Sequence, residues 1–310
     1  MLQTVDPVPM PMTELTTTRS AALPRTAKRS AQLVAASART TLDPFEAVDW
    51  DVPIDDSAYH LPPEWLPLYA TATWDAMTEP ERMAYSRHEA AAMYGAGIWF
   101  ENQLMQIVLR HLVELPVTDP SHRYLLVEVA DECRHSTMFG EFIRRAGTPA
   151  YAPDVPAVDY TALPGGRALG YLLILAVEEL LDAVNRATMK DDRVHPVSRQ
   201  CAKLHVLEEA RHVSFAKTYL SEVWDTLAEE DRAAATALSP AAVHLMATLT
   251  IDPLVYTTLG ITDGEELARG NPHHRARVID GLAKLTDFLR ELGVIDETNE
   301  AEWRGRGLVA

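Results

Sequence analysis

Two stretches of the chain carry the same polar string on apolar, helix-like segments: DECRHSTMF at residues 131–139 and HVLEEARHVSF at residues 205–215. Each reads acid, acid, spacer, Arg, His. A residue in an α-helix turns by about 100°, so a Glu and a His three positions apart lie on one face. These pairs are Glu132 with His135 and Glu209 with His212. Burying such carboxylates is costly without a cation, so the two strings predict the halves of one metal site.

One Glu-x-x-His motif alone is more often a surface pair or a core histidine with satisfied hydrogen bonds. A di-metal carboxylate bundle needs two such motifs and one further Glu from each of two other helices. Glu101 in AAAMYGAGIWFENQLMQIVL meets the first requirement, and Glu178 or Glu179 in GYLLILAVEELLDAV meets the second. Glu178 is preferred because its helical face is apolar, and Glu179 stays an alternative.

His205 precedes Glu209 by four residues and His212 by seven, so the three side chains fall within a narrow arc of one helix. His205 is therefore either a further ligand or a hydrogen-bond partner of a ligand. An ideal helix separates residues seven apart by about 10 Å along its axis. If His205 and His212 reach the same metal, a local widening such as a π-bulge is expected.

Other polar residues near these motifs are expected to support the site. Asp131 and Glu208 each precede a ligand acid and can accept a ring N–H from a histidine across the bundle. Asp182 shares the face of Glu178 and is assigned the same supporting role. Arg134 and Arg211 either pair with these acids beneath the metals or form ordinary structural ion pairs. A substrate pocket is expected beside Glu101, where glycine leaves room, near Tyr94, Gly97 and Ile98.

Helical spacing recurs along the chain, and persistent strand alternation is missing from the sequence, so the fold class is all-α. Capping residues, Pro and Gly predict four core helices at about residues 78–115, 120–146, 166–190 and 196–227. Two supporting helices are expected to begin at Ser239–Pro240 and Asn271–Pro272. Residues 43–310 form one domain, with an irregular segment at 43–77. Residues 1–42 are expected to be a poorly ordered N-terminal arm.

Composition narrows the functional class. A formal charge of −17 argues against nucleic acid or an anionic membrane as a partner. The chain has only two cysteines, Cys133 and Cys201, so a framework of disulfides is not expected. A reducing cytoplasm is the favoured location. The sequence predicts no membrane span and no secretion signal. The sequence has no flavin or nicotinamide fingerprint, so a redox reaction at the predicted metal site would require an external electron donor.

The chain resembles the para-aminobenzoate N-oxygenase family of ferritin-like di-iron enzymes, which convert arylamines towards hydroxylamine and nitro products. The stretches that carry the resemblance run from about residue 43 to the end of the fourth core helix: DPFEAVDWDVP, LPPEWLPLYATATWDAMTEPERMAYSRHE, GIWFENQLMQ, DECRH and HVLEEARH. The most specific is a third histidine, His205, four residues before the last Glu-x-x-His. The resemblance implies a ferritin-like bundle with additional helices.

The resemblance further implies metal ligands at Glu101, Glu132, His135, Glu178, His205, Glu209 and His212. It implies a homodimer with two iron ions per chain, O₂ as co-substrate and a peroxo-diferric intermediate that a small-molecule amine attacks. Hydroxylation at carbon is the alternative within the same chemistry. A ferritin-like iron store or ferroxidase is the third reading, and it is disfavoured because the chain is long and has extra helices.

Overall fold

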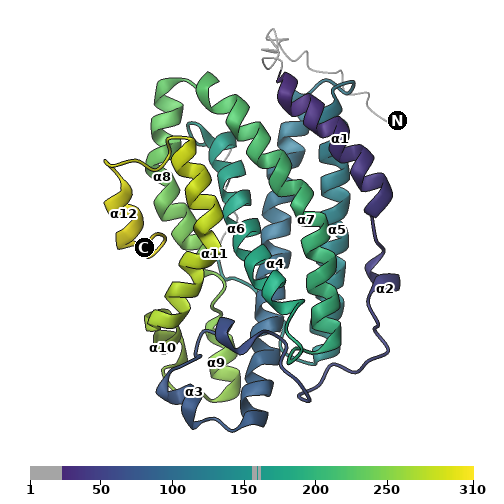
Figure 1. The fold of residues 1–310 in the computed structure, drawn as a ribbon, viewed down its shortest axis with the longest axis vertical. Helices are drawn as coiled ribbons and strands as arrows, with labels where there is room; N and C mark the ends of the chain where they lie inside the picture. The colour runs from purple at the N-terminus through teal and green to yellow at the C-terminus, as the bar shows by residue number, and fades with distance from the viewer. Residues whose placement is uncertain (1–22, 156–158, 160–161) are drawn as a thin grey trace, which may run out of the picture.

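The computed structural model describes residues 23–155, 159 and 162–310, and over these residues the chain is an all-α bundle with additional helices (Figure 1). Its centre consists of four long helices: α4 (Glu79–Glu114), α5 (Pro120–Ala146), α6 (Gly166–Thr188) and α7 (Pro196–Val223). α4 packs against α5 and α6 packs against α7, and further contacts join α4 to α6 and α5 to α7. This is the ferritin-like arrangement expected from the sequence.

The core helices begin where the sequence places their caps. Thr78 and Glu81 form a capping box at the start of α4, with Glu81 Oε2 accepting from the Thr78 N–H at 2.7 Å. The Asp119 side chain accepts from the Ser121 N–H at 2.7 Å at the start of α5. Gly147 follows α5 with φ of 64°, the left-handed conformation that ends many helices. The caps therefore set the register that brings the polar motifs to one level.

The expectation of a poorly ordered arm is wrong for the described part of residues 1–42, and residues 1–22 lie outside the described residues. Helix α1 (Pro24–Thr40) lies across α5 and α7 (Figure 1). Its buried face carries Thr26, Ser30, Leu33 and Ser37, and such small side chains allow a close approach of helices. The Glu222 carboxylate on α7 accepts the backbone N–H of Thr26 at 2.7 Å, which satisfies a donor in the first turn.

The segment before α4 is irregular, as expected, and holds short helices: α2 (Pro44–Ala47), η1 (Pro63–Trp65) and α3 (Ala72–Ala76). Backbone groups fix it to the bundle. The His195 N–H donates to Tyr59 O at 2.7 Å, and the His60 N–H donates to Ser86 Oγ at 2.7 Å. The segment therefore closes one end of the bundle rather than extending from it.

The remaining helices cover one side of the bundle: α8 (Glu229–Thr248), α9 (Pro253–Leu259), α10 (Gly264–Gly270), α11 (Pro272–Glu291) and α12 (Glu300–Gly305). Both α8 and α11 pack on α6. The predicted helix start at Ser239–Pro240 is wrong, because α8 begins at Glu229 and runs through Pro240. Three acids in its first turn favour that start. An interior proline removes one hydrogen bond and its ring crowds the preceding turn, so packing of the buried Pro240 has to offset this cost.

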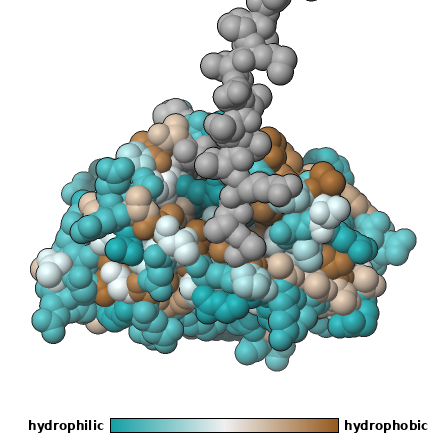
Figure 2. Space-filling model, turned by 90° about the horizontal axis from the view of Figure 1, so that it is seen from above, coloured by the Kyte–Doolittle hydropathy of each residue, from teal (hydrophilic) through white to brown (hydrophobic). Residues whose placement is uncertain are grey.

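One helical stretch among the described residues, Glu229–Leu259, is long and apolar enough by composition to cross a membrane, which the sequence reading did not foresee. In the structure it is α8 followed by α9, and α8 packs against α6 with Val243 and Met246 buried. A core helix of a soluble protein passes the same test. On the end of the molecule seen in Figure 2, hydrophobic residues are interspersed with hydrophilic ones.

Candidate metal centre

Seven acidic and histidine side chains from the four core helices meet in the middle of the bundle, and none is more than 3% exposed. They form three groups, each with ligand atoms within 4.8 Å of one another. The groups are Glu101, His135, His205 and Glu209; Glu132, Glu209 and His212; and Glu101, Glu132 and Glu178. The structure therefore brings together all seven residues that the sequence and the resemblance point to.

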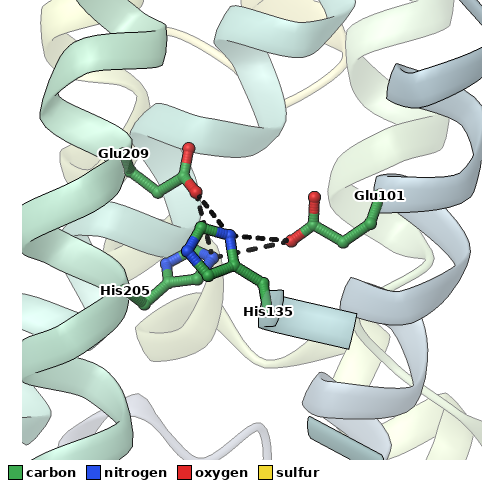
Figure 3. Close-up of side chains that lie close together, drawn as sticks. All are labelled: Glu101, His135, His205 and Glu209. Atoms are coloured by element: carbon green, nitrogen blue, oxygen red, sulfur yellow. Dashed lines mark ion pairs between the residues drawn. The ribbon is translucent and has the colours of Figure 1, made fainter. Parts of the chain in front are cut away.

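Figure 3 shows the first group, in which Glu101 from α4 faces three side chains from α5 and α7. His135 Nδ1 lies 3.0 Å from Glu209 Oε1 and 3.9 Å from Glu101 Oε1. His205 Nε2 lies 3.6 Å from Glu209 Oε1 and 3.7 Å from Glu101 Oε1. Two imidazole nitrogens and two carboxylate oxygens thus surround one point, which suits a transition metal.

The second group lies next to the first because they share a residue. His212 Nδ1 is 2.8 Å from Glu132 Oε1 and 2.9 Å from Glu209 Oε2. Glu209 therefore directs one oxygen to each histidine-containing group. Glu101 and Glu132 also belong to two groups each, with Glu178 joining them in the third. Carboxylates shared in this way are suited to bridging two adjacent cations.

The outer nitrogens of two histidines are held by acids across the bundle. His135 on α5 places Nε2 2.9 Å from Glu208 Oε2 on α7, and His212 on α7 places Nε2 3.3 Å from Asp131 Oδ2 on α5. In the neutral form of each ring, an acid there favours the proton on Nε2 and leaves the Nδ1 lone pair available to a metal ion. Asp131 and Glu208 occupy the supporting positions that their place in the repeated string suggested.

Arg134 and Arg211 neutralise those two acids. Arg211 lies 2.9 Å from Asp131 and 3.5 Å from Glu208, while Arg134 pairs with Asp131 and lies 3.4 Å from Glu208. Of the two readings open from the sequence, pairing beneath the histidines is the one that the contacts match. Two guanidinium groups and two carboxylates then leave this layer without net charge.

The third histidine is held by a residue that sequence reasoning missed. Asn185 Nδ2 lies 3.1 Å from His205 Nδ1, and both side chains are buried. Asn185 follows Glu178 by seven residues on the same face of α6, which is the signal that could have found it. Asp182, which was expected to support the site, instead contacts Arg186 at 2.6 Å and Lys284 at 3.4 Å.

The two adjacent acids of α6, Glu178 and Glu179, have different partners in the structure. Glu178 belongs to a group with Glu101 and Glu132, whereas Glu179 is paired with Lys217 at 2.5 Å. Both are buried, so burial alone does not distinguish them. The 100° rotation between neighbours does, because only one of two consecutive side chains can face the bundle centre.

α7 remains α-helical from Pro196 to Val223, so the structure has no π-bulge at His205. None is needed, because His205 and His212 belong to different groups. Each of the two histidines can therefore serve its own group without a local widening of the helix.

The pKa values show how the cluster compensates its charge with protons alone. Burial, together with nearby carboxylates, raises the pKa of Glu101 and Glu178 well above the usual range. Burial alone would lower the pKa of His135 and His212, but contacts with buried carboxylates raise both well above the usual value. Without a cation, therefore, protonation of these two acids and of these two histidines is favoured, which reduces the negative charge of the cluster.

Several buried atoms at the centre have no hydrogen-bond partner, and this tests whether metal ions fit. They come from all four core helices: Glu101 Oε2, Glu132 Oε1, Glu178 Oε2, His205 Nε2 and Glu209 Oε1. Orphaned polar atoms in a core are costly, and two cations would satisfy them. Four carboxylates also balance the charge of two divalent ions. The donor set, four carboxylates and three imidazoles, fits iron.

Glu128, one turn before Glu132 in α5, is a further buried acid that sequence reasoning missed. Neither of its carboxylate oxygens has a hydrogen-bond partner. Burial raises its pKa to about 8, so it stays protonated at neutral pH and adds no negative charge to the cluster. Its place in the apolar run YLLVEVADE was the available signal.

The pocket expected at Tyr94, Gly97 and Ile98 is wrong, because Phe139 fills that space. A Cβ on Gly97 would lie 3.1 Å from the Phe139 ring, and Tyr94 stacks on the same ring at a centroid distance of 4.8 Å. The glycine serves close packing of that ring, which in turn lies 5.3 Å from the His205 ring. An aromatic wall therefore covers the histidine side of the cluster.

A small cavity lies on the opposite side, against Glu178. It has a volume of about 30 Å³ and lies between α4, α6 and α8. Its walls are mainly apolar and include Trp99, Phe100, Leu104 and Met246. A cavity of this volume holds only one or two water molecules, so a larger molecule requires Trp99 or Met246 to move.

Comparison with known proteins places the chain in a family. The model of the family described as P-aminobenzoate N-oxygenase AurF matches residues 24–293. Uncharacterized proteins of Mycobacterium bovis and Mycobacterium tuberculosis are each 25% identical over 293 residues, covering 88% of this chain and 85% of the relative. The family match begins earlier than the resemblance suggested, at α1, and includes every residue of the cluster. This chain therefore belongs to the p-aminobenzoate N-oxygenase AurF family.

Proposed function

We propose that this protein is a non-haem di-iron, O₂-dependent monooxygenase that N-oxygenates a small-molecule amine, taking an arylamine towards hydroxylamine and nitro products. The observation that carries the proposal is the buried set of four carboxylates and three histidines, with His205 as the additional imidazole. Family membership supports the same reaction class.

Two iron ions would be held by Glu101, Glu132, His135, Glu178, His205, Glu209 and His212. When bound, they would supply the electrons that reduce O₂ and so make one oxygen atom available for transfer. The chain's own residues fix the ligands. Glu208, Asp131 and Asn185 hold the outer ring nitrogens, and Arg134 and Arg211 balance the charge of the two acids.

The substrate approaches, in this proposal, from the cavity against Glu178. Its apolar walls exclude water and suit an aromatic ring, while Gln103 is the one neutral amide in the lining. The cluster's other side is covered by Phe139. The amine nitrogen would therefore reach the metals past Glu178, the carboxylate that the cavity exposes.

The supply of electrons and the assembly of the enzyme are further parts of the proposal. An external reductant returns the irons to the ferrous state, because the sequence has no flavin or nicotinamide motif. The protein acts as a cytoplasmic homodimer, with neither nucleic acid nor a membrane as partner. The strongly acidic composition supports the last two exclusions.

The test begins with iron. Protein purified with iron should contain about two irons per chain, since the donor set provides two adjacent positions. The reduced protein is then exposed to ¹⁸O₂ with an arylamine, and the products are identified by mass. A product carrying ¹⁸O on nitrogen supports the proposal.

The same experiment separates the competing functions when p-toluidine is the probe, because its methyl and amine groups offer carbon and nitrogen in one molecule. Labelled 4-aminobenzyl alcohol as the only product would mean carbon hydroxylation and would overturn N-oxygenation. Iron oxidation without labelled organic product across a panel of arylamines would favour a ferroxidase. Absence of bound iron would remove both oxygenase readings.

A further inference from the structure

A cavity of about 540 Å³ lies on the outer side of the bundle, away from the metal centre. It is formed by the end of α8, by α10 and α11, and by residues 304–310 at the end of the chain. In Figure 1 these elements lie together on the side of the molecule farthest from α1. The family match ends at residue 293, so the wall formed by residues 304–310 lies outside it.

The charge of this cavity opposes that of the whole chain. Its lining contains Arg269, Arg275, Arg304 and Arg306, together with His244 and His274, and no Asp or Glu side chain among its described residues. The chain carries 45 acids against 28 basic residues. A concave, cation-lined site on so acidic a protein concentrates small anions locally.

Two of these four arginines form no ion pair with an acidic side chain among the described residues: Arg275, and Arg304, whose Nε donates to Ala310 O at 2.9 Å. Arg269 pairs with Glu265 at 2.9 Å and Arg306 pairs with Glu302 at 2.9 Å, and both acids lie outside the lining. The side chain of Arg275, in contrast, forms neither a hydrogen bond nor an ion pair within the described part of the chain. Arg275 is exposed, so its guanidinium donors are available to solvent or to a ligand in the cavity.

The fold holds Arg275 against this cavity. A Cβ added to Gly307 would lie 3.2 Å from Arg275 Cδ, so the arginine stem packs directly on that glycine. Gly307 has φ of 71°, a conformation that favours glycine. His244 Nδ1 is 3.0 Å from Arg306 O and fixes the same turn to α8. The chain end thus positions the unpaired guanidinium.

One wall of the cavity adds a second feature. His274 Nδ1 is buried without a hydrogen-bond partner among the described residues, and His274 lines both this cavity and a smaller one next to Trp65 and Glu89. The lining also includes the apolar side chains of Ile251, Val278 and Leu308. Apolar walls beside cationic side chains suit a ligand that has both an apolar body and an anionic group.

We propose that this cavity binds a small organic anion, with its carboxylate or phosphate group on Arg275 and its apolar body on Ile251, Val278 and Leu308. A planar guanidinium with free donors suits both anions, since each can accept two parallel N–H bonds. The volume is within the range of about 300–1,000 Å³ that is typical of ligand sites. This site is independent of the proposed oxygenase function.

The test measures binding by isothermal titration calorimetry with full-length protein, with and without iron. Octanoate and octyl phosphate are the two anionic probes, and their relative affinity distinguishes the carboxylate from the phosphate source. Octanol provides the apolar body without charge, and inorganic phosphate provides charge without the body. We expect at least one anionic probe to bind more tightly than both controls, roughly tenfold or more.

Two matched variants assign the binding to Arg275. Arg275→Ala should lower the affinity for the tighter-binding anionic probe roughly tenfold. Arg277 lies on the same helix but is paired with Asp280 at 2.7 Å, so Arg277→Ala should leave that affinity unchanged. Circular dichroism confirms that both variants are folded. Equal affinity for octanol and octanoate, absence of binding to either anion, or an unaltered Arg275→Ala variant would each overturn the proposal.

Discussion

Asn185 faces His205 with an amide group whose two ends differ in hydrogen bonding. Nδ2 lies 3.1 Å from His205 Nδ1, and Oδ1 is buried without a partner. A 180° turn of this amide exchanges the two ends and presents an acceptor to the ring. Nδ1 then carries the proton and the Nε2 lone pair is free to face the cluster. Asn185 can therefore serve both the metal-free and the metal-bound tautomers of His205.

We predict that Asn185→Leu weakens iron binding roughly 10–100-fold, the effect typical of losing a residue that orients a metal ligand. Leucine is similar in size but cannot hold the ring. Competition with a chelator of known affinity measures the change, and Asn102→Leu, on the exposed face of α4, is the control. Equal iron affinity in the wild type and the Asn185 variant would show that packing alone orients His205.

The adjacent acids of α6 provide a matched pair. Glu178→Gln removes one of the four carboxylates that balance the cations, so we expect iron content below the full complement of about two per chain. Glu179→Gln should keep full iron content, because that side chain pairs with Lys217. Metal analysis after identical reconstitution compares them. Iron loss in the Glu179 variant alone would reverse the assignment.

His60 predicts an acid-sensitive contribution to stability. Burial lowers its pKa to about 4, with Asp55, Asp56, Arg87 and His195 as the charged or titratable neighbours. His60 becomes protonated below about pH 6.5 in the unfolded state but only below about pH 4 in the folded state. Its contribution to stability is therefore fully present above pH 6.5 and is lost as the pH falls from 6.5 towards 4. The loss between pH 7.5 and pH 5 is about 2 kcal/mol.

Urea unfolding of metal-free wild type and His60→Gln at both pH values measures this contribution. Glutamine keeps polar contacts without titrating, so the wild type should lose about 2 kcal/mol more than the variant on acidification. Equal losses in the two proteins would mean that His60 becomes protonated without leaving the fold.

The sequence predicted the core helices well because their boundaries depend on local chemistry. Asp119–Pro120 and Gly147 define α5 through a cap, a fixed φ and a left-handed residue, none of which requires tertiary contacts. α1 was missed for the opposite reason. Its buried face carries Thr26, Ser30 and Ser37 beside the single large apolar residue Leu33, and the backbone of its first turn is satisfied by Glu222 from a distant helix.

The metal centre also has features that local sequence determines and features that only tertiary contacts determine. Ligand spacing along α5 and α7 follows from helix geometry and could be predicted, whereas the pocket could not. Gly97 was read as open space, but whether a glycine leaves room or admits a ring depends on the facing helix, here on Phe139. Similarly, Asn185 contacts His205 whereas Asp182 pairs with Arg186, and which residue of α6 reaches the histidine depends on the facing helices.

Two glycines in core helices should respond oppositely to alanine. A Cβ on Gly95 would lie 2.0 Å from Tyr151 O, so Gly95→Ala must displace backbone and should destabilise the protein by about 1–3 kcal/mol. Gly140 has no atom within 4 Å of its Cβ position, so Gly140→Ala should stabilise the helix by about 0.5–1 kcal/mol. Thermal unfolding of both variants checks the signs, and a stabilised Gly95→Ala would contradict this packing.

The cavity against Glu178 makes the last prediction, which rests on the proposed function. Met246 lines two adjoining cavities between α6 and α8, so Met246→Trp should fill the approach to the cluster, and Met246→Ala should widen it. We expect kcat/KM for an arylamine to fall roughly tenfold or more in the tryptophan variant, equivalent to about 1.4 kcal/mol of transition-state binding, with iron content unchanged. Leu245→Trp, on the exposed face of the same helix, is the control. If Leu245→Trp reduced turnover as much as Met246→Trp, or if neither did, the substrate would reach the metals by another route.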